Sequence, residues 1–254
     1  MLGETLADTR VRVQLCGRIC VEIDGQRREP QLPGPQGRRL FAYLTIHRFD
    51  TLTRQDLVAA LWGEQLPASP EPALNALLSR LRAALAPVAL DGPRLVLPRA
   101  AWVDLEAARD AIHRAESSVA QQDWGRAWSA SQITMFTAKR GFLPGEDLPW
   151  IAEIRRELDS LHVRALEAYA QASLNVAGAE LATAERSARD LVARAPFRES
   201  GYRVLMAALA ARGNTAEALR VYDTLMRLLR DELGVIPSEQ TRNLHTQLLR
   251  YPSN

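Results

Sequence analysis

The stretch "PALNALLSRLRAAL", residues 72–85, decides how the N-terminal part of this chain folds. Its leucines recur at the spacing of one buried α-helical face, at Leu74, Leu77, Leu78, Leu81 and Leu85. The opposite face carries short residues with an amide and arginines at its edges: Pro72, Ala76, Ser79 and Ala83, flanked by Asn75, Arg80 and Arg82. Such a face is either a solvated surface or one that lies against phosphates and base edges.

Short elements are predicted on both sides of this helix. Residues 10–33 alternate apolar and polar side chains around the turn pair Asp24-Gly25, which predicts a small antiparallel sheet. Helices are predicted in "RRLFAYLTIHR" and in "TLTRQDLVAALWG", where Thr53 is a candidate N-cap. "VALDGPRLVLP" predicts a hairpin around Asp91-Gly92. Strands, helices and a hairpin in this order are the outline of a winged helix, a relative of the helix-turn-helix.

From Trp102 onward the pattern is helical and rich in alanine, and it contains an internal repeat. Equivalent positions lie 34 residues apart in the pairs Ala184/Ala218, Ala188/Tyr222 and Leu191/Leu225. A glycine turn precedes each unit, at Gly178 and Gly213. This period is typical of tetratricopeptide repeats, in which helix pairs stack into a solenoid. A generic helical bundle is the alternative. The aromatic residues Trp124, Trp128 and Phe136 are expected to pack in the core of this part.

Composition and charge narrow the class of protein. The chain has 254 residues, enough for two domains, and 47% of them are hydrophobic. No apolar run approaches the ~18–20 residues of a membrane span. "MLGETLADTR" lacks the apolar core of a signal peptide, so we expect a cytoplasmic protein. Residues 1–100 carry 13 arginines and 10 acidic residues, a net charge of +3 that permits nucleic acid as a partner. Cys16 and Cys20 are expected to be small buried side chains.

Five stretches carry a resemblance to a known family: "LPGPQGRRLFAYL", "TRQDLVAALWGEQLPAS", "ALNALLSRLRAAL", "GFLPGEDLPWIAEIRREL" and "GNTAEALRVYDTLMRLLRDELGVIPSEQTRNLHTQLL". By these stretches the chain resembles the Streptomyces antibiotic regulatory protein (SARP) family of transcriptional activators. The resemblance implies an α+β fold for residues 1–100, a winged helix-turn-helix DNA-binding domain of the OmpR/PhoB type. For residues 101–254 it implies an all-α tetratricopeptide-like solenoid, the bacterial transcriptional activator domain (BTAD).

The resemblance also implies partners. In the family, the helix containing "SRLR" enters the major groove of double-stranded promoter DNA, and the hairpin after it contacts the neighbouring backbone. The loop "GEQLPASPEP" corresponds to a stretch that contacts RNA polymerase, and the helical domain is expected to form a homodimer. We therefore predict a DNA-binding activator of biosynthetic genes of the secondary-metabolite type. The chain departs from the family pattern at Glu71, Pro72 and Ala83, and in its hairpin.

Arginines at predicted helix starts and on the hairpin add candidate phosphate contacts. Arg38 and Arg39 open the first helix and Arg54 opens the second, where a helix N-terminus already favours an anion. The complete set of candidate DNA-binding residues is Asn75, Ser79, Arg80, Arg82, Arg54, Arg38, Arg39, Arg94 and Arg99. Exposed arginines are also common on surfaces that bind nothing, and that alternative stays open for each of them.

The sequence offers no support for an enzyme, a cofactor or a metal ion. "GPQGRR" lacks the Lys-Ser/Thr of a phosphate-binding loop, and the four histidines are scattered singly. No GxSxG or HExxH motif is present. The alternative to the activator is a degenerate winged helix in a scaffold protein. Such a scaffold would bind a partner protein or peptide in the concave face of the solenoid.

Overall fold

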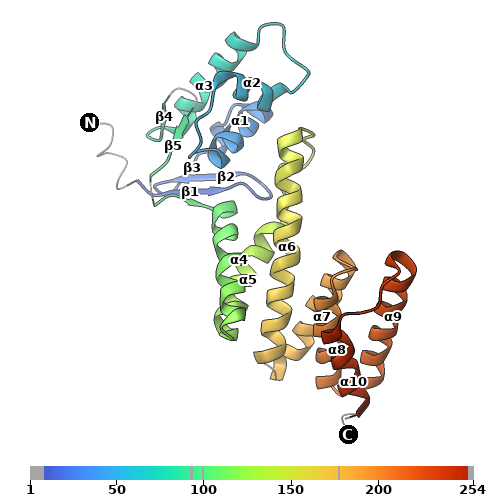
Figure 1. Cartoon of the computed structure of the whole chain (residues 1–254). Helices are drawn as coiled ribbons and strands as arrows, with labels where there is room; N and C mark the ends of the chain where they lie inside the picture. The colour runs from blue at the N-terminus through green and yellow to red at the C-terminus, as the bar shows by residue number, and fades with distance from the viewer. Residues whose placement is uncertain (1–8, 92–93, 99, 177, 251–254) are drawn as a thin grey trace. The chain divides into compact units, whose positions relative to one another are not determined.

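The computed structural model describes residues 9–250, apart from residues 92, 93, 99 and 177 (Figure 1). The chain forms two compact units. The first comprises Met1–Ala107 together with Arg140–Glu157, and the second comprises Ala108–Lys139 together with Leu158–Asn254.

A small sheet forms the base of the first unit. In its described residues, four strands lie in the order β3-β2-β1-β6: β1 (Val11–Gln14), β2 (Cys20–Ile23), β3 (Gln26–Arg27) and β6 (Trp102–Val103). β1, β2 and β3 are antiparallel, as predicted, and Asp24 and Gly25 both have positive φ at the turn. β6 pairs parallel with β1, with Val103 opposite Val13. The prediction that the chain is helical from Trp102 onward is therefore wrong for these residues, because so short a strand leaves no alternating pattern.

Helices α1 (Gly34–Ile46), α2 (Arg54–Trp62) and α3 (Pro70–Leu85) pack against one another after the 3-10 turn η1 (Glu29–Gln31). Thr53 and Asp56 form the capping box that starts α2, with the Thr53 N–H donating to Asp56 at 2.7 Å. All the leucines that define the stripe of α3 are buried. Phe49 lies beyond the end of α1 and is 75% exposed, so it does not extend the apolar face of that helix.

The hairpin that follows α3 consists of β4 (Ala89–Asp91) and β5 (Arg94–Val96), which are antiparallel. Its predicted turn at Gly92 lies outside the described residues. Contacts join β4 to α3 and β5 to α1, so the hairpin flanks the helices as the wing of a winged helix does.

Residues that follow the hairpin in the sequence complete the first unit. Asp104 begins α4 (Asp104–Ala120), and its buried carboxylate accepts hydrogen bonds from the backbone N–H groups of Leu15 at 2.8 Å and Cys16 at 3.1 Å. Arg140 lies 3.2 Å from the same carboxylate. Burial raises the pKa of Asp104 although these hydrogen bonds and Arg140 act to lower it. The buried carboxylate thus ties the start of α4 to the end of β1.

The segment after Arg140 also belongs to the first unit. The backbone of Phe142 forms an isolated antiparallel β-bridge with that of Cys16. Near the start of α6 (Pro149–Val176), the indole N–H of Trp150 donates a hydrogen bond to the carbonyl of Ala60 at 3.0 Å. The compact units therefore do not follow a single cut at residue 100, because residues 140–157 group with the winged helix. The boundary between residues 100 and 101, as a division between fragments that fold separately, stays a prediction.

The second unit is helical throughout its described residues: parts of α4 and α6, α5 (Trp124–Lys139), the 3-10 turn η2 (Gly178–Glu180), α7 (Leu181–Arg194), α8 (Glu199–Ala211), α9 (Thr215–Leu233) and α10 (Glu239–Arg250). α8 packs between α7 and α9, and α10 contacts both α8 and α9. The predicted equivalent positions are all buried: Ala184, Ala188 and Leu191 on α7, and Ala218, Tyr222 and Leu225 on α9. The stacked helix pairs thus have the fold class that the period of 34 residues predicts.

The aromatic residues of α5 differ in their surroundings. Trp128 is half-buried and lies 5.8 Å from the ring of Tyr169, between ring centroids. Trp124 is also half-buried. Phe136, by contrast, is 58% exposed, so the expectation that it belongs to the core is wrong. Of the described helices, none combines the length and the apolarity that a membrane crossing requires.

Candidate nucleic-acid interface

Helix α3 presents the two faces that its sequence predicts. Leu78 is 2% exposed and Leu81 is fully buried, whereas Arg82 is exposed. The outward face is formed by short and polar side chains that are all exposed: Pro72, Asn75, Ala76, Ser79, Arg80, Arg82 and Ala83. Short side chains allow a helix backbone to approach the floor of a major groove, which admits an α-helix. The geometry of α3 therefore suits a recognition helix.

Arg54, at the start of α2, connects this helix to α3. Its guanidinium donates to the Glu71 carboxylate, from Nε at 3.0 Å and from one terminal nitrogen at 2.8 Å. The same terminal nitrogen donates to the side-chain oxygen of Asn75 at 2.7 Å. The structure thus brings together two predicted site residues, Arg54 and Asn75. Glu71 joins them, a residue that the sequence analysis noted only as a departure from the family.

The remaining predicted residues of α3 and the hairpin differ in how they are engaged. Arg80 is exposed, and its Nε donates to the carbonyl of Ala76 in its own helix at 3.3 Å. Arg94, on β5, donates from Nε to the carbonyl of Arg48 at 3.4 Å. Arg99 lies outside the described residues. Arg80 therefore keeps an outward charge, while the Arg94 side chain is held against the turn after α1.

α1 begins at Gly34, so Arg38 and Arg39 lie in its second turn and do not open the helix as predicted. These two neighbouring residues have opposite surroundings. Arg38 is exposed. Arg39 is 18% exposed at its side chain, donates to the carbonyl of Leu61 and forms an ion pair with Glu146. Its guanidinium holds α2 and the segment before α6 together within the first unit. These contacts favour a structural role for Arg39, whereas Arg38 is available to a ligand.

A shallow apolar groove borders the loop between α2 and α3. It has a volume of about 580 Å³ and is lined by Gln55, Val58, Ala59, Gly63, Leu66, Ser69, Pro70, Glu71 and Pro72. Leu66, in the loop, is 56% exposed. This groove coincides with the loop for which the family resemblance implies a contact with RNA polymerase.

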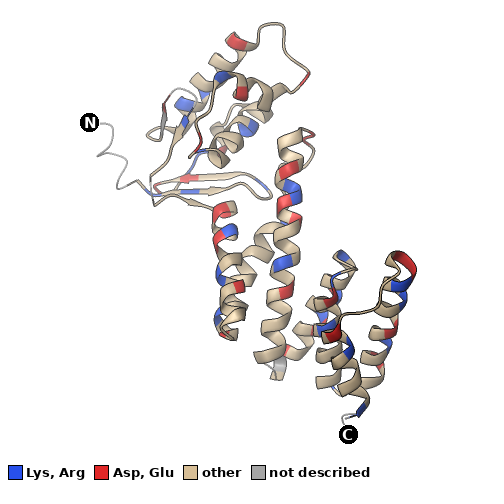
Figure 2. Cartoon of the chain, viewed as in Figure 1, with Lys and Arg blue, Asp and Glu red and all other residues tan. Residues whose placement is uncertain are grey.

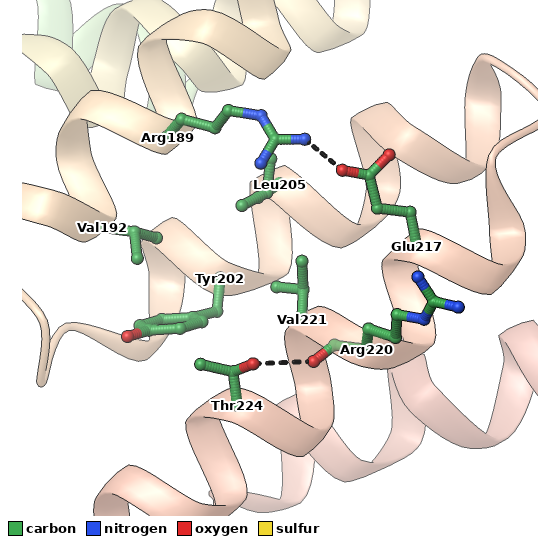
Figure 3. A pocket seen from close by; sticks show the side chains of 8 residues that line it. All are labelled: Arg189, Val192, Tyr202, Leu205, Glu217, Arg220, Val221 and Thr224. Carbon is green, nitrogen blue, oxygen red and sulfur yellow. Dashed lines mark hydrogen bonds and ion pairs between the residues drawn. The ribbon is translucent and has the colours of Figure 1, made fainter.

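A second groove lies in the repeat, between α7, α8 and α9 (Figure 3). Its volume is about 470 Å³, and its lining residues are Arg189, Val192, Tyr202, Leu205, Glu217, Arg220, Val221 and Thr224. Arg189 and Glu217 form an ion pair across one end of it at 2.5 Å. The sequence did not single out these residues, because they meet only after the repeat has stacked. They surround an apolar floor that is open to a partner side chain.

Basic and acidic residues alternate along the repeat helices, as Figure 2 shows for α7 and α9. Arg194 pairs with Asp190, and Arg212 pairs with Glu185. On α3 the only acidic residue is Glu71, at its N-terminal end. Because α3 has no acid beyond its first turn, the middle and the end of its outward face are basic.

Comparisons with known proteins agree with this architecture. The model of the bacterial transcriptional activator domain matches residues 103–249. The regulatory protein AfsR of Streptomyces coelicolor is 33% identical over 220 residues, which are 85% of this chain and 22% of AfsR. The transcriptional regulatory protein EmbR of Mycobacterium tuberculosis is 26% identical over 271 residues, 98% of this chain and 66% of EmbR. The regulatory protein DnrI of Streptomyces peucetius is 25% identical over 262 residues, 94% of this chain and 92% of DnrI.

The solved structure of Mycobacterium tuberculosis EmbR in complex with a low-affinity phosphopeptide has a similar fold. The match has a TM-score of 0.77 and 23% identity, and it covers 97% of this chain and 67% of the EmbR chain. This chain therefore spans about a fifth of the length of AfsR and two thirds of that of EmbR. Because the activator-domain model covers more than half of the sequence, and because a winged helix precedes that domain, the chain belongs to the SARP-type family of bacterial transcriptional activators.

Proposed function

We propose that the chain is a transcriptional activator that binds double-stranded promoter DNA in the major groove through α3. The observation that carries this proposal is the outward face of α3, where exposed short residues lie between Asn75, Arg80 and Arg82 while every leucine of the stripe is buried. Ser79 and Asn75 supply hydrogen-bonding groups to base edges, and the arginines reach guanine or phosphates. Arg38, which is exposed in the second turn of α1, adds a phosphate contact.

This layout supplies more contacts to phosphates than to bases. Phosphate contacts fix the position of a protein on the duplex but carry no sequence information directly. One copy of the winged helix is therefore expected to bind weakly and with modest discrimination. We propose that specificity comes from two copies on adjacent half-sites, linked by a homodimer of the helical domain.

Activation requires a second contact, and the groove beside Leu66 is suited to make it. Its exposed leucine and the apolar side chains Val58 and Ala59 lie at the loop between α2 and α3. When α3 lies in the major groove, this loop projects beside the duplex. We propose that it recruits RNA polymerase at promoters of biosynthetic genes, in the cytoplasm.

The test of DNA binding is a salt titration of affinity on a promoter fragment and on a random duplex. The logarithm of the binding constant should fall with the logarithm of salt concentration by about 0.9 per phosphate neutralised. Arg80→Ala should flatten this slope by about one unit. Arg126→Ala is the matched control, because Arg126 is an exposed arginine of α5 with a 72% exposed side chain. Absence of binding by the wild-type protein at low salt would contradict the proposal.

The groove of the repeat supports a second candidate, a scaffold that holds a partner peptide. Its floor of Val192, Leu205 and Val221 is suited to an apolar side chain. Val221→Glu would place a charge on that floor. The measurement is transcription of a reporter gene in cells that contain each variant. If activation persists in the double variant Arg80→Ala/Arg82→Ala but is lost in Val221→Glu, the scaffold explains the activity and the DNA-binding proposal does not.

A further inference from the structure

Glu71 is an unexpected residue on a surface that approaches DNA. It is the only acid in α3, its side chain is 57% exposed, and it lies one helical turn before Asn75 on the same side of the helix. A carboxylate near phosphates weakens binding by like-charge repulsion. Its position in the first turn of α3 is favourable to the helix dipole, but that effect is worth only about 0.3–1 kcal/mol in general. The contacts of Glu71 indicate a further role.

The Glu71 carboxylate holds Arg54 in one place and in one orientation. Both hydrogen bonds from Arg54 end on the same carboxylate oxygen, at 3.0 and 2.8 Å. A guanidinium that already has a carboxylate partner gains less from a phosphate, because it must exchange one anion for another. Arg54 is therefore a poor phosphate clamp in this chain, in contrast to the prediction from its position at a helix start.

Arg54 in turn fixes the amide of Asn75. A guanidinium only donates hydrogen bonds, so the amide atom that lies 2.7 Å from it must be the oxygen and not the NH₂ group. The NH₂ group of Asn75 has no protein partner among the described residues, and the side chain is exposed. The amide is consequently offered to a ligand mainly as a donor.

We propose that Glu71 is a positioning residue for sequence recognition: it neutralises Arg54 and, through Arg54, orients Asn75 as a hydrogen-bond donor to the acceptor edge of guanine. In the major groove guanine presents two acceptors, N7 and O6, whereas cytosine presents a donor. An amide whose oxygen is already engaged favours guanine over adenine, because adenine uses the oxygen as well as the NH₂ group in its bidentate contact with asparagine. The inference rests on the proposed DNA binding.

The charge balance gives the proposal a measurable consequence. In the wild-type protein, Arg54 neutralises Glu71 and contributes little to the release of counterions from DNA. In Glu71→Gln the guanidinium is released to a phosphate, so the salt slope should steepen by about one unit. The affinity for random duplex should then rise by roughly five- to tenfold at low salt, since one phosphate contact is added. The preference for guanine at the contacted position should weaken at the same time.

The experiment measures salt titrations on random duplex and base preference by selection from a randomised duplex library. The variants are Glu71→Gln, Arg54→Gln and the double variant, with Glu64→Gln as the matched control. Glu64 is an exposed acid of the same loop region with no ion pair among the described residues, so its substitution changes the net charge equally. Arg54→Gln alone should not steepen the slope, and it should weaken the affinity because the Glu71 carboxylate is no longer neutralised. In the double variant it should remove the gain of Glu71→Gln. Asn75→Ala should lose the guanine preference by roughly tenfold without changing the slope.

The outcomes separate this inference from the proposed function. If the wild-type protein binds DNA but Glu71→Gln behaves as Glu64→Gln does, in slope and in base preference, the pair is an ordinary surface ion pair and the inference is wrong while DNA binding stands. If Glu71→Gln changes only the thermal stability, Glu71 acts on the helix dipole alone and the inference is again wrong. If the wild-type protein binds no duplex at low salt, both proposals fail.

Discussion

Arg80 on α3 and three arginines of the repeat have the same chemistry but different partners. In the repeat, Arg189, Arg194 and Arg212 each form an ion pair with a carboxylate of their own or a neighbouring helix. On α3, Arg80 contacts only a backbone carbonyl of its own helix among the described residues. An arginine that already has a carboxylate partner is a weak phosphate ligand. Arg80 therefore differs from these three arginines of the repeat, although Arg227 of α9 also donates to a carbonyl of its own helix, at 3.2 Å.

The same comparison applies within the first unit, where it divides the predicted site. Arg80 and Arg38 have exposed side chains that are open to phosphate, whereas Arg39 is half-buried on Glu146 and Arg54 is held by Glu71. The predictions below test this division, starting with the largest effect on stability.

The largest effect is expected in the core beneath the outward face of α3. Leu81 is fully buried, and Leu→Ala at such a site costs about 2–5 kcal/mol of unfolding free energy. Leu81→Ala should therefore abolish DNA binding and lower amide-exchange protection in α1–α3, with protection of α7–α9 retained. Leu225→Ala, at an equally buried position of the repeat, is the reciprocal control. If Leu81→Ala or Leu225→Ala lowers amide-exchange protection in both α1–α3 and α7–α9, the two regions do not unfold separately.

Glu199 provides a test of pairing in the repeat, where carboxylates serve stability. It accepts hydrogen bonds from the hydroxyl groups of Ser238 at 2.7 Å and Thr241 at 2.6 Å, and from the Ser238 N–H at 2.9 Å. Burial alone would raise the pKa of Glu199, but the hydrogen bonds from Thr241 and Ser238 outweigh it, and the pKa is lowered. A lowered pKa means that this stabilisation is present above the unfolded pKa of Glu and is lost as the pH falls through the folded value.

Glu199→Gln should therefore cost about 1–2 kcal/mol at pH 7, since several hydrogen bonds to a charged group are weakened. The difference in unfolding free energy from the wild-type protein should shrink as the pH falls below roughly 4. Urea unfolding followed by circular dichroism at a series of pH values measures this. A difference that does not depend on pH would mean that the ionised carboxylate is not what stabilises the end of the repeat.

Arg39 and Arg38 form a matched pair for the distinction between structural and DNA-facing arginines. Arg39→Ala removes contacts to Leu61 and Glu146, so it should destabilise the first unit by about 1 kcal/mol. Arg38→Ala should change stability by less than about 0.5 kcal/mol, because the side chain is exposed. The salt slope of DNA binding should flatten for Arg38→Ala and stay unchanged for Arg39→Ala at temperatures where both are folded. If the slope instead flattens for Arg39→Ala and stays unchanged for Arg38→Ala, Arg39 and not Arg38 contacts the phosphate, and the prediction is wrong.

Sequence patterns predicted the elements of this fold well where a period repeats over many residues. The leucine stripe of α3 and the equivalent positions of α7 and α9 are buried as expected, because burial is what maintains such periods. β6 was not predicted, since pairing of Val103 with Val13 depends on a strand far away in the sequence. Phe136 was assigned to the core because aromatic residues usually pack inside, yet 58% of it is exposed.

The candidate site was predictable in position but not in detail. The outward face of α3 follows from the helical period alone. The ion pairs of Arg54 and Arg39 do not follow from that period, because the partners are distant in the sequence. Glu71 lies 17 residues from Arg54, and Glu146 lies 107 residues from Arg39. The spacing of Glu71 and Asn75, one turn apart, was a visible signal that both share a face. It gave no indication of the arginine that joins them.

The smallest effect on stability is expected at Arg82, on the same turn of α3 as Leu81 but on its outward side. Because the side chain is exposed, Arg82→Ala should change the unfolding free energy by less than about 0.5 kcal/mol. If Arg82 contacts a phosphate, the same change should flatten the salt slope by about one unit. If it contacts guanine, it should instead relax base preference at one position and leave the slope nearly unchanged, because base contacts release few counterions. Thermal unfolding and salt titration on the same preparation separate these results. Unfolding of the unit by Arg82→Ala would mean that this arginine is structural, as Arg39 is, and that its exposed position does not make it a DNA-binding residue.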